Sequence, residues 1–313
     1  MTRASLLFGG LLVLAVIPLF VQDSYTRHLF ILAFIYAVIA SNWDLSLGYA
    51  GLFNFGHLVF FATGVYTVAI AAKTLGISPW LAIPMSGVTA AIAGLIVSAP
   101  VARLKGIYVV LVTFAFGQLV LQLILSQSHL TGGAEGMVRI PYLQIGDYKF
   151  ISDFKLGYYY VALGLLIVST LYLLWVTNST FGKSLLAVRD NEDYARARGI
   201  WITRQRVLVL TLSAIFPGVA GGFFAAYLRV ASPEVLSFGT LSLALSMVLI
   251  GGAGTIIGPI IAAFLLIFAT EAMAGIRGME DARFLIVAIG MILVLRFAPG
   301  GLAQLVRAPR KKP

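Results

Sequence analysis

The sequence contains no cysteine among its 313 residues, which excludes disulfides, thiolate metal sites and cysteine nucleophiles. Charged residues are also scarce, because they make up 11% of the chain, whereas an ordinary soluble domain has about 25%. Hydrophobic residues make up 60% of the chain. This composition identifies an integral membrane protein.

The chain is equally poor in groups that carry out chemistry. It has three histidines, His28, His57 and His129, and their dispersal in the sequence does not favour a membrane enzyme. The stretch FGKS at 181–184 resembles the end of a phosphate-binding loop, but Thr177 stands where that loop needs its first glycine, and no buried strand precedes it. We therefore expect the chain itself to bind no ATP, no other cofactor and no metal.

The net charge of +10 would suggest nucleic-acid binding in a soluble protein. In a membrane protein, basic residues instead collect in the cytoplasmic loops. We accordingly expect contact with membrane lipid and no contact with nucleic acid.

Long apolar runs predict an all-α, polytopic bundle that forms a single domain. A helix that spans the bilayer needs roughly 20 mostly apolar residues. Ten runs qualify, at 5–21, 28–45, 56–73, 79–99, 106–127, 157–177, 207–228, 236–251, 256–274 and 283–298. The first is interpreted as a retained span, with a signal peptide as the alternative. The second and the eighth are the least regular, and we expect either to be a candidate for a broken or re-entrant helix.

The longest charged segment separates the sixth and seventh runs. Residues 178–206 hold six of the 22 Lys and Arg residues and three acids. A basic loop between spans belongs on the cytoplasmic side. With ten spans, both termini are then cytoplasmic as well, and the loops assigned to that side account for the whole net charge of +10.

Two short helices are predicted inside this basic loop. Phe181, Leu185 and Val188 recur at helical spacing and form one apolar stripe. Asp190 is predicted to cap a second helix that ends near Gly199. An amphipathic helix of this kind fits a groove in a partner protein, and the alternative is a helix that rests on lipid headgroups.

Candidates for a translocation path come mainly from the glycine-rich stretch at 43–68. They are Gly48, Gly51, Asn54, Gly56, His57, Gly64 and Tyr66, together with the uncharged polar residues Thr113, Gln118 and Ser246. For the glycines, close helix packing is the favoured alternative. Asn54 and His57 are alternatively expected to hydrogen-bond to neighbouring groups, and His57 is interpreted as a structural histidine. Asp44 and Glu271 lie near the ends of their spans, which does not favour a proton-coupled carrier.

Two further patterns concern local structure. The loop at 128–156 contains Gly-Gly and Pro141 within an alternating apolar pattern, which suggests turns and a short hairpin. The stretches GLFNFGHLVFFATG (51–64) and PEVLSFGTLSLALSM (233–247) share a Phe-Gly step that opens an apolar run. Internal repeats are common in transporters and often enclose the substrate path, although chance similarity between apolar stretches is the alternative.

Several stretches together resemble one known family. They are LGYAGLFNFGHLVFFATGVYT (47–67), ARLKGIYVVLVTFAFGQ (102–118), STFGKSLLAVRDNEDYARARGI (179–200) and GVAGGFFAAYLRVASPEVLSF (218–238). The chain is similar to the LivM-type permease subunits of branched-chain amino-acid ABC importers. The resemblance implies a heterodimer with a homologous LivH-type permease in the bacterial inner membrane. It also implies two cytoplasmic ATPase subunits, which carry ATP and Mg, and a periplasmic binding protein that delivers the substrate.

The same resemblance implies which residues contact the ATPase. They are Phe181, Gly182, Lys183, Ala187, Arg189, Asp190, Asn191, Glu192, Ala195 and Gly199, and Leu185 and Val188 complete the predicted coupling loop. The chain departs from many members of the family at Asn54, where they have serine, and at Leu58 and Val59, where they have small residues. The substrate therefore stays open between hydrophobic amino acids and the urea, amides or aromatic acids of related importers. A secondary carrier or channel that works alone would need buried coupling charges or a selectivity ring, which the sequence does not offer.

Overall fold

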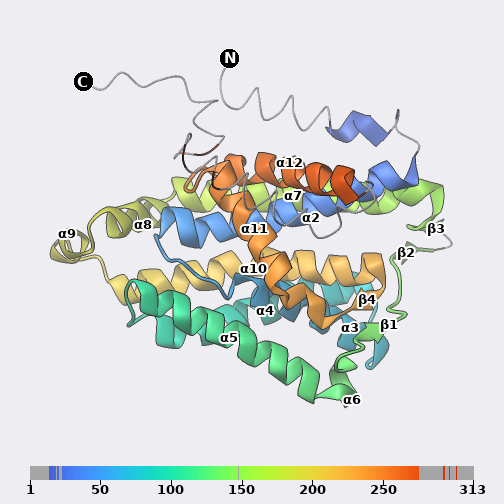
Figure 1. Ribbon diagram of the computed structural model, residues 1–313, viewed down its shortest axis with the longest axis horizontal. Helices are drawn as coiled ribbons and strands as arrows, with labels where there is room; N and C mark the ends of the chain where they lie inside the picture. Colours follow the sequence, from blue (N-terminus) through green and yellow to red (C-terminus); the bar gives the residue numbers. More distant parts are fainter. Residues whose placement is uncertain are drawn as a thin grey trace.

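The computed structural model describes residues 23–146 and 148–274, together with residues 14–18, 20, 292, 296 and 301. Eight helices form a bundle, and most of them lie along the longest axis of the molecule (Figure 1). They are α2 (Ser24–Asp44), α3 (His57–Lys73), α4 (Pro79–Val101), α5 (Ile107–Ser126), α7 (Ser152–Asn178), α10 (Ile202–Leu228), α11 (Phe238–Gly251) and α12 (Ile257–Ala274).

All eight helices agree, within five residues at each end, with the apolar runs of the sequence. Within the described residues, five helical segments are long and apolar enough to cross a membrane, namely α2 with its extension to Tyr49, α4, α5, α7 and α10. The other three, α3, α11 and α12, are shorter apolar helices. The structure thus shows an all-α membrane protein but does not confirm ten spans. The expected first and tenth spans lie mostly outside the described residues.

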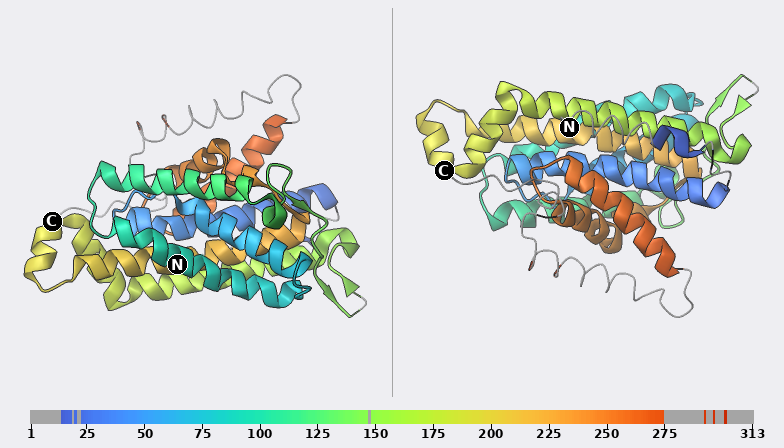
Figure 2. Two further views of the ribbon diagram at one scale, coloured as in Figure 1. Left: turned by 90° about the horizontal axis from the view of Figure 1, so that it is seen from below. Right: turned by 90° about the horizontal axis from the view of Figure 1, so that it is seen from above.

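The two ends of the bundle are built differently (Figures 1 and 2). At one end, here called the coupling end, α8 (Thr180–Asp190) and α9 (Glu192–Ala197) project from the bundle. The opposite end, here called the strand end, carries α6 (Ser128–Thr131) and four short strands: β1 (Met137–Val138), β2 (Gln144–Ile145), β3 (Tyr148–Lys149) and β4 (Val230–Ala231).

Two strand pairs organise the strand end. β2 and β3 form an antiparallel hairpin, which confirms the hairpin expected between residues 128 and 156. β1 pairs with β4, and next to this pair the amide of Ile140 donates to the carbonyl of Arg229 at 3.2 Å, while Arg229 Nε donates to the carbonyl of Ile140 at 3.0 Å. This second pairing joins the long loop to the segment that leads into α11.

Of the two helices that the sequence indicated as irregular, α2 changes its helix type near its end and α11 is continuous but short. α2 passes at Leu45–Tyr49 into η1, a π-helical segment of a kind that is rare and often functional. Residues 50–56 then reach α3 without helix or strand, and Gly51 there has a left-handed φ of 68°. α11 follows a 3-10 turn, η2 (Pro233–Leu236), and has only 14 residues. At about 1.5 Å per residue it is shorter than a hydrocarbon core of about 30 Å.

A buried carboxylate joins the end of α2 to the start of α12. Asp44 accepts hydrogen bonds from the backbone amides of Gly254 (2.6 Å), Thr255 (2.9 Å) and Ile256 (2.9 Å). The sequence analysis placed Asp44 near the end of its span, but its side chain is 0% exposed. A carboxylate is tolerated in such a place because several N–H donors replace its water.

Close glycine packing holds α3 against α10. A Cβ atom added at Gly64 would overlap the carbonyl group of Gly218. The same carbonyl accepts a hydrogen bond of 3.0 Å from the hydroxyl of Ser86 on α4. Small residues allow this backbone approach inside a membrane bundle, so the packing alternative holds at Gly64.

We expect Asp44→Asn to lower the melting temperature in detergent more than Asp23→Asn does. One terminal atom of asparagine is itself a donor, so a buried amide at Gly254–Ile256 loses its acceptor, at a cost of about 1–3 kcal/mol. Asp23 is the matched control, because it accepts from the amide of Thr26 (2.7 Å) at the exposed start of α2, where asparagine caps equally well. Equal melting temperatures would contradict the role of Asp44.

We also expect Gly64→Ala to destabilise the bundle by about 1–3 kcal/mol, because the added methyl group overpacks the contact with α10. Gly164 on α7 is the control, since a Cβ there would meet nothing within 4 Å. Thermal unfolding of the two alanine variants in one detergent measures the difference. A Gly64→Ala variant as stable as Gly164→Ala would show that α3 and α10 do not approach this closely.

Candidate functional site

The coupling loop folds as two short helices. Ser179 caps α8 by accepting from the amide of Gly182, and Leu185 is buried while Phe181 and Val188 are half-buried, which confirms the apolar stripe. The predicted cap of the second helix is wrong by one residue. Asn191, not Asp190, caps α9 by accepting from the amide of Tyr194 at 2.9 Å, because Asn191 is the residue with extended backbone between the two helices. Gly199 has the expected left-handed φ, 82°, just after α9.

Exposure divides the predicted coupling residues into two groups. Gly182, Leu185 and Ala195 are buried, and the half-buried residues are Phe181, Ala187, Val188 and Glu192. The exposed residues are Lys183, Arg189, Asp190, Asn191 and Gly199. The exposed residues are the ones that a partner protein could reach.

Glu192 ties α9 to the body of the bundle. Its carboxylate lies 3.3 Å from Lys105, 3.2 Å from Arg206 and 3.3 Å from Arg196. Arg206 stands near the start of α10, is 8% exposed and also donates to the carbonyl of Leu104 at 2.6 Å. A displacement of α9 would therefore act on α10 and on the connection between α4 and α5.

Arg189 ties α8 to the break in α2. Its Nη1 atom donates to the carbonyl of Gly48 at 2.8 Å, while Nε and Nη2 bind Asp190. Gly51 lies against the same side chain, since a Cβ added there would be 2.9 Å from Cγ of Arg189. Gly48 in turn packs on the backbone of Gly254, close to the carboxylate of Asp44. The coupling loop thus contacts the π-helical segment directly.

A groove of about 470 Å³ opens at the coupling end. Residues 50–53, the start of α5 and the coupling loop form its walls. Leu52, Phe53 and Ile107 are among its apolar residues, and Arg189 and Glu192 are among its charged ones. The groove therefore offers apolar and charged surface next to the loop expected to meet a partner.

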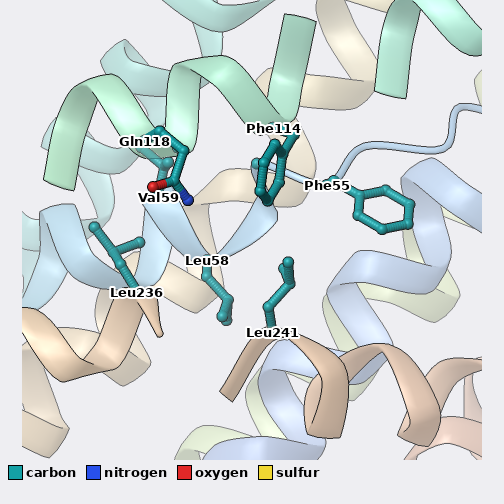
Figure 3. Close-up of a pocket in the computed structure, with 9 residues that line it drawn as sticks. Phe55, Leu58, Val59, Phe114, Gln118, Leu236 and Leu241 are labelled. Atoms are coloured by element: carbon teal, nitrogen blue, oxygen red, sulfur yellow. The ribbon is translucent and has the colours of Figure 1, made fainter. Parts of the chain in front are cut away.

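A much smaller cavity, of about 20 Å³, lies further along α5 (Figure 3). It is lined by Phe55, Gly56, Leu58, Val59, Phe114, Gly117, Gln118, Leu236 and Leu241. A water molecule needs about 10–15 Å³ measured in this way, so the cavity has room for water and not for an amino acid.

One layer of residues separates the groove from the cavity. Along α5 the groove reaches Val110 and the cavity begins at Phe114, about 6 Å further on at 1.5 Å per residue. Between them Thr113 is buried, and its hydroxyl accepts from the amide of Phe55 at 3.0 Å. Asn54 is also fully buried, and its Oδ1 atom accepts from the amide of Gly56 at 2.9 Å. Residue 54 thus lies between Phe53, which lines the groove, and Phe55, which lines the cavity.

The structure brings together only some of the predicted path residues. Gly56 and Gln118 line the cavity, Gly51 lines the groove, and Asn54 and Thr113 lie in the layer between them. The candidates that line neither space are Gly48, His57, Gly64, Tyr66 and Ser246. The sequence analysis did not select Leu236, Leu241 and Phe114, because an apolar residue in a membrane span carries no individual signal.

His57 differs from its expectation. Its ring stacks on that of Trp43, with 5.2 Å between the ring centroids, and it is 0% exposed. Neither ring nitrogen has a hydrogen-bond partner in the described part of the chain, so the expected hydrogen bond is wrong. Among the described residues, no group of three or more His, Asp or Glu side chains is arranged to hold a metal.

Comparisons with known proteins identify the family to which the sequence belongs. A family model described as the branched-chain amino acid transport system / permease component matches residues 25–295. The high-affinity branched-chain amino acid transport system permease protein LivM of Escherichia coli K12 is 30% identical, over 99% of this chain and 77% of that protein. The protein of the same name from Salmonella typhimurium LT2 is 29% identical over the same shares.

A more distant relative comes from an archaeon. The probable branched-chain amino acid transport permease protein LivM of Methanocaldococcus jannaschii is 22% identical, over 62% of this chain and 65% of that protein. No solved structure matches the chain. The match to the family model over most of the sequence shows that the chain belongs to the family of permease components of branched-chain amino acid transport systems.

Proposed function

We propose that this chain is the membrane-spanning permease subunit of an ATP-driven importer for branched-chain or other hydrophobic amino acids. The observation that carries the proposal, beyond the family itself, is the bond from Arg189 to Gly48. It connects the loop that we place in the cytoplasm to the irregular end of α2, from which residues 50–56 lead to the small cavity. In this proposal ATP and Mg are bound by two separate ATPase subunits, and the chain has no enzymatic activity of its own.

The proposed assembly follows from the resemblance to its relatives. A LivH-type permease pairs with this chain in a bacterial inner membrane, and a periplasmic binding protein delivers the substrate at the strand end. The chain has ten spans with both termini in the cytoplasm. The ion pair between Lys105 and Glu192 supports the placement of their two loops on the same side of the membrane, because both lie at the coupling end.

The lining of the cavity favours an apolar substrate. Leu58, Val59, Leu236, Leu241 and two phenylalanines supply dispersion contacts, and Gln118 is the polar side chain among the lining residues. The same machine acting on urea, amides or aromatic acids is the second candidate. Urea and amides would need more polar partners than this lining supplies.

The mechanism begins with a displacement of α8 and α9 by the ATPases. Nucleotide shifts the permease between outward-open and inward-open states only if the ATPases bind this loop differently in each state. The ion pairs of Glu192 then carry the displacement to α10 and to the start of α5, and Arg189 carries it to residues 48–51.

Uptake of radiolabelled leucine by membrane vesicles tests the function. The vesicles carry this chain with the products of its neighbouring genes, and we expect uptake to require both ATP and the external binding protein. Leucine uptake that does not depend on ATP would indicate a secondary carrier instead. If a different loaded binding protein stimulates the ATPase while leucine is not taken up, the importer stands and the substrate class is wrong.

We expect Arg189→Ala to lower ATP-driven uptake about tenfold or more, a loss typical of broken coupling between sites. The reason is the loss of the hydrogen bond to Gly48, and the melting temperature should stay close to that of the wild type. Arg198→Ala is the matched control, because Arg198 is an exposed residue of the same loop whose side chain contacts Tyr194. Wild-type uptake by the Arg189→Ala variant would contradict this coupling route.

A further inference from the structure

The two matching stretches of the sequence meet at the small cavity. Aligning their Phe-Gly steps places FGHL at 55–58 on FGTL at 238–241, so that Leu58 corresponds to Leu241. Both leucines line the cavity, and Figure 3 shows them extending toward one another from α3 and α11. The two similar stretches of sequence, whose likeness chance could have produced, therefore each contribute a leucine to the same cavity.

The aligned residues before the two helices each accept a hydrogen bond from a nearby backbone amide. Asn54 corresponds to Ser237 in the same alignment. The Oδ1 atom of Asn54 accepts from the amide of Gly56, and the hydroxyl oxygen of Ser237 accepts from the amide of Thr240. The two bonds are not equivalent, because Ser237 caps α11, whereas Asn54 lies two residues before Gly56, the residue that precedes α3, and does not cap that helix.

The two helices run in opposite directions. α3 begins next to the break that Arg189 holds, and the next helix, α4, begins near the strand end, where Trp80 donates to the carbonyl of Gln144 at 2.9 Å. α11 instead begins after β4 and η2 at the strand end and finishes at Gly251, just before the turn bound by Asp44. Their first turns meet at the cavity from opposite sides.

Matching segments that run in opposite directions are one feature of an inverted repeat. Repeats of opposite topology are related by an axis in the plane of the membrane, and in transporters the substrate passes between them near the middle of the bilayer. Interrupted helices that begin at such a point are typical of the path itself. The cavity is the place where the first turns of α3 and α11 share lining residues.

We propose that Leu58 and Leu241 are the two equivalent halves of one apolar gate across the substrate path, an inference that rests on the proposed function. The gate is closed in this structure, because Leu58 is 2% exposed, Leu241 is 6% exposed and the cavity between them measures about 20 Å³. An apolar constriction excludes water and ions by dewetting. When the leucines separate, they contact the aliphatic side chain of the substrate by dispersion.

The absence of cysteine from the chain makes a crosslinking test direct. Cysteines are introduced at Leu58→Cys and Leu241→Cys in the complete importer and bridged with a short, reducible bifunctional thiol reagent. We expect the crosslink to form and to lower ATP-driven leucine uptake about tenfold or more. Reduction of the crosslink should restore uptake. The matched control pairs Leu58→Cys with Leu243→Cys, which lies two residues further on α11 and faces about 200° away.

Each outcome of the crosslinking test decides something. Absence of a bridge between positions 58 and 241 overturns the gate, because it shows that the two side chains do not meet. A bridge that leaves uptake intact overturns it as well, because the path then lies elsewhere. If the wild-type importer takes up no leucine, that result contradicts the proposed function instead. The measurement of passive permeability then still tests the gate.

A second measurement needs neither ATP nor the correct substrate. We expect Leu58→Ala and Leu241→Ala each to raise the passive permeability of vesicles to glycerol by a similar factor, because either truncation opens the same constriction. Leu163→Ala on α7 is the control, since Leu163 is 4% exposed but lines neither the cavity nor the groove. Unchanged permeability in both leucine variants would overturn the gate whatever the importer carries.

Discussion

The three hydrogen bonds to the carboxylate of Asp44 are the constraint on which the layout of the coupling end depends. An isolated charge is strongly disfavoured in a low-dielectric interior, so the carboxylate and the amides of Gly254–Ile256 hold one another in place. Gly48 can then lie against Gly254, with its carbonyl available to Arg189. Segments about 210 residues apart thereby fix the ends of α2 and α11 relative to one another.

The positions of the helices could be predicted because their information is local. Apolar runs gave the eight long helices of the described chain to within five residues, and the spacing of Phe181, Leu185 and Val188 gave the stripe on α8. The cap of α9 was misplaced because Asp190 and Asn191 are both good caps. Only the extended backbone of Asn191 decides between them.

The site was less predictable because its contacts are not local. The acceptors and donors around Asp44 and Glu192 come from distant segments, and no pattern in the sequence indicates which charges will meet. His57 stacks on Trp43 with no hydrogen-bond partner for either ring nitrogen among the described residues, which its type alone would not suggest. Leu241 carries no signal as a single residue, and Leu58 stands out only as a departure from the small residue of many relatives, so the repeated Phe-Gly-x-Leu pattern is what marks them as a pair.

The pairing of β1 with β4 has a mechanical consequence. β4 leads through η2 into α11. A displacement of the loop at 128–156 would therefore be passed to α11 through only a few backbone residues. The segment that leads into α3 is held at the coupling end instead, by the hydrogen bond from Arg189 to the carbonyl of Gly48. Leu58 and Leu241 therefore lie on helices that are held at opposite ends of the bundle. In the proposed gate, a change at one end of the bundle alone therefore does not open the path.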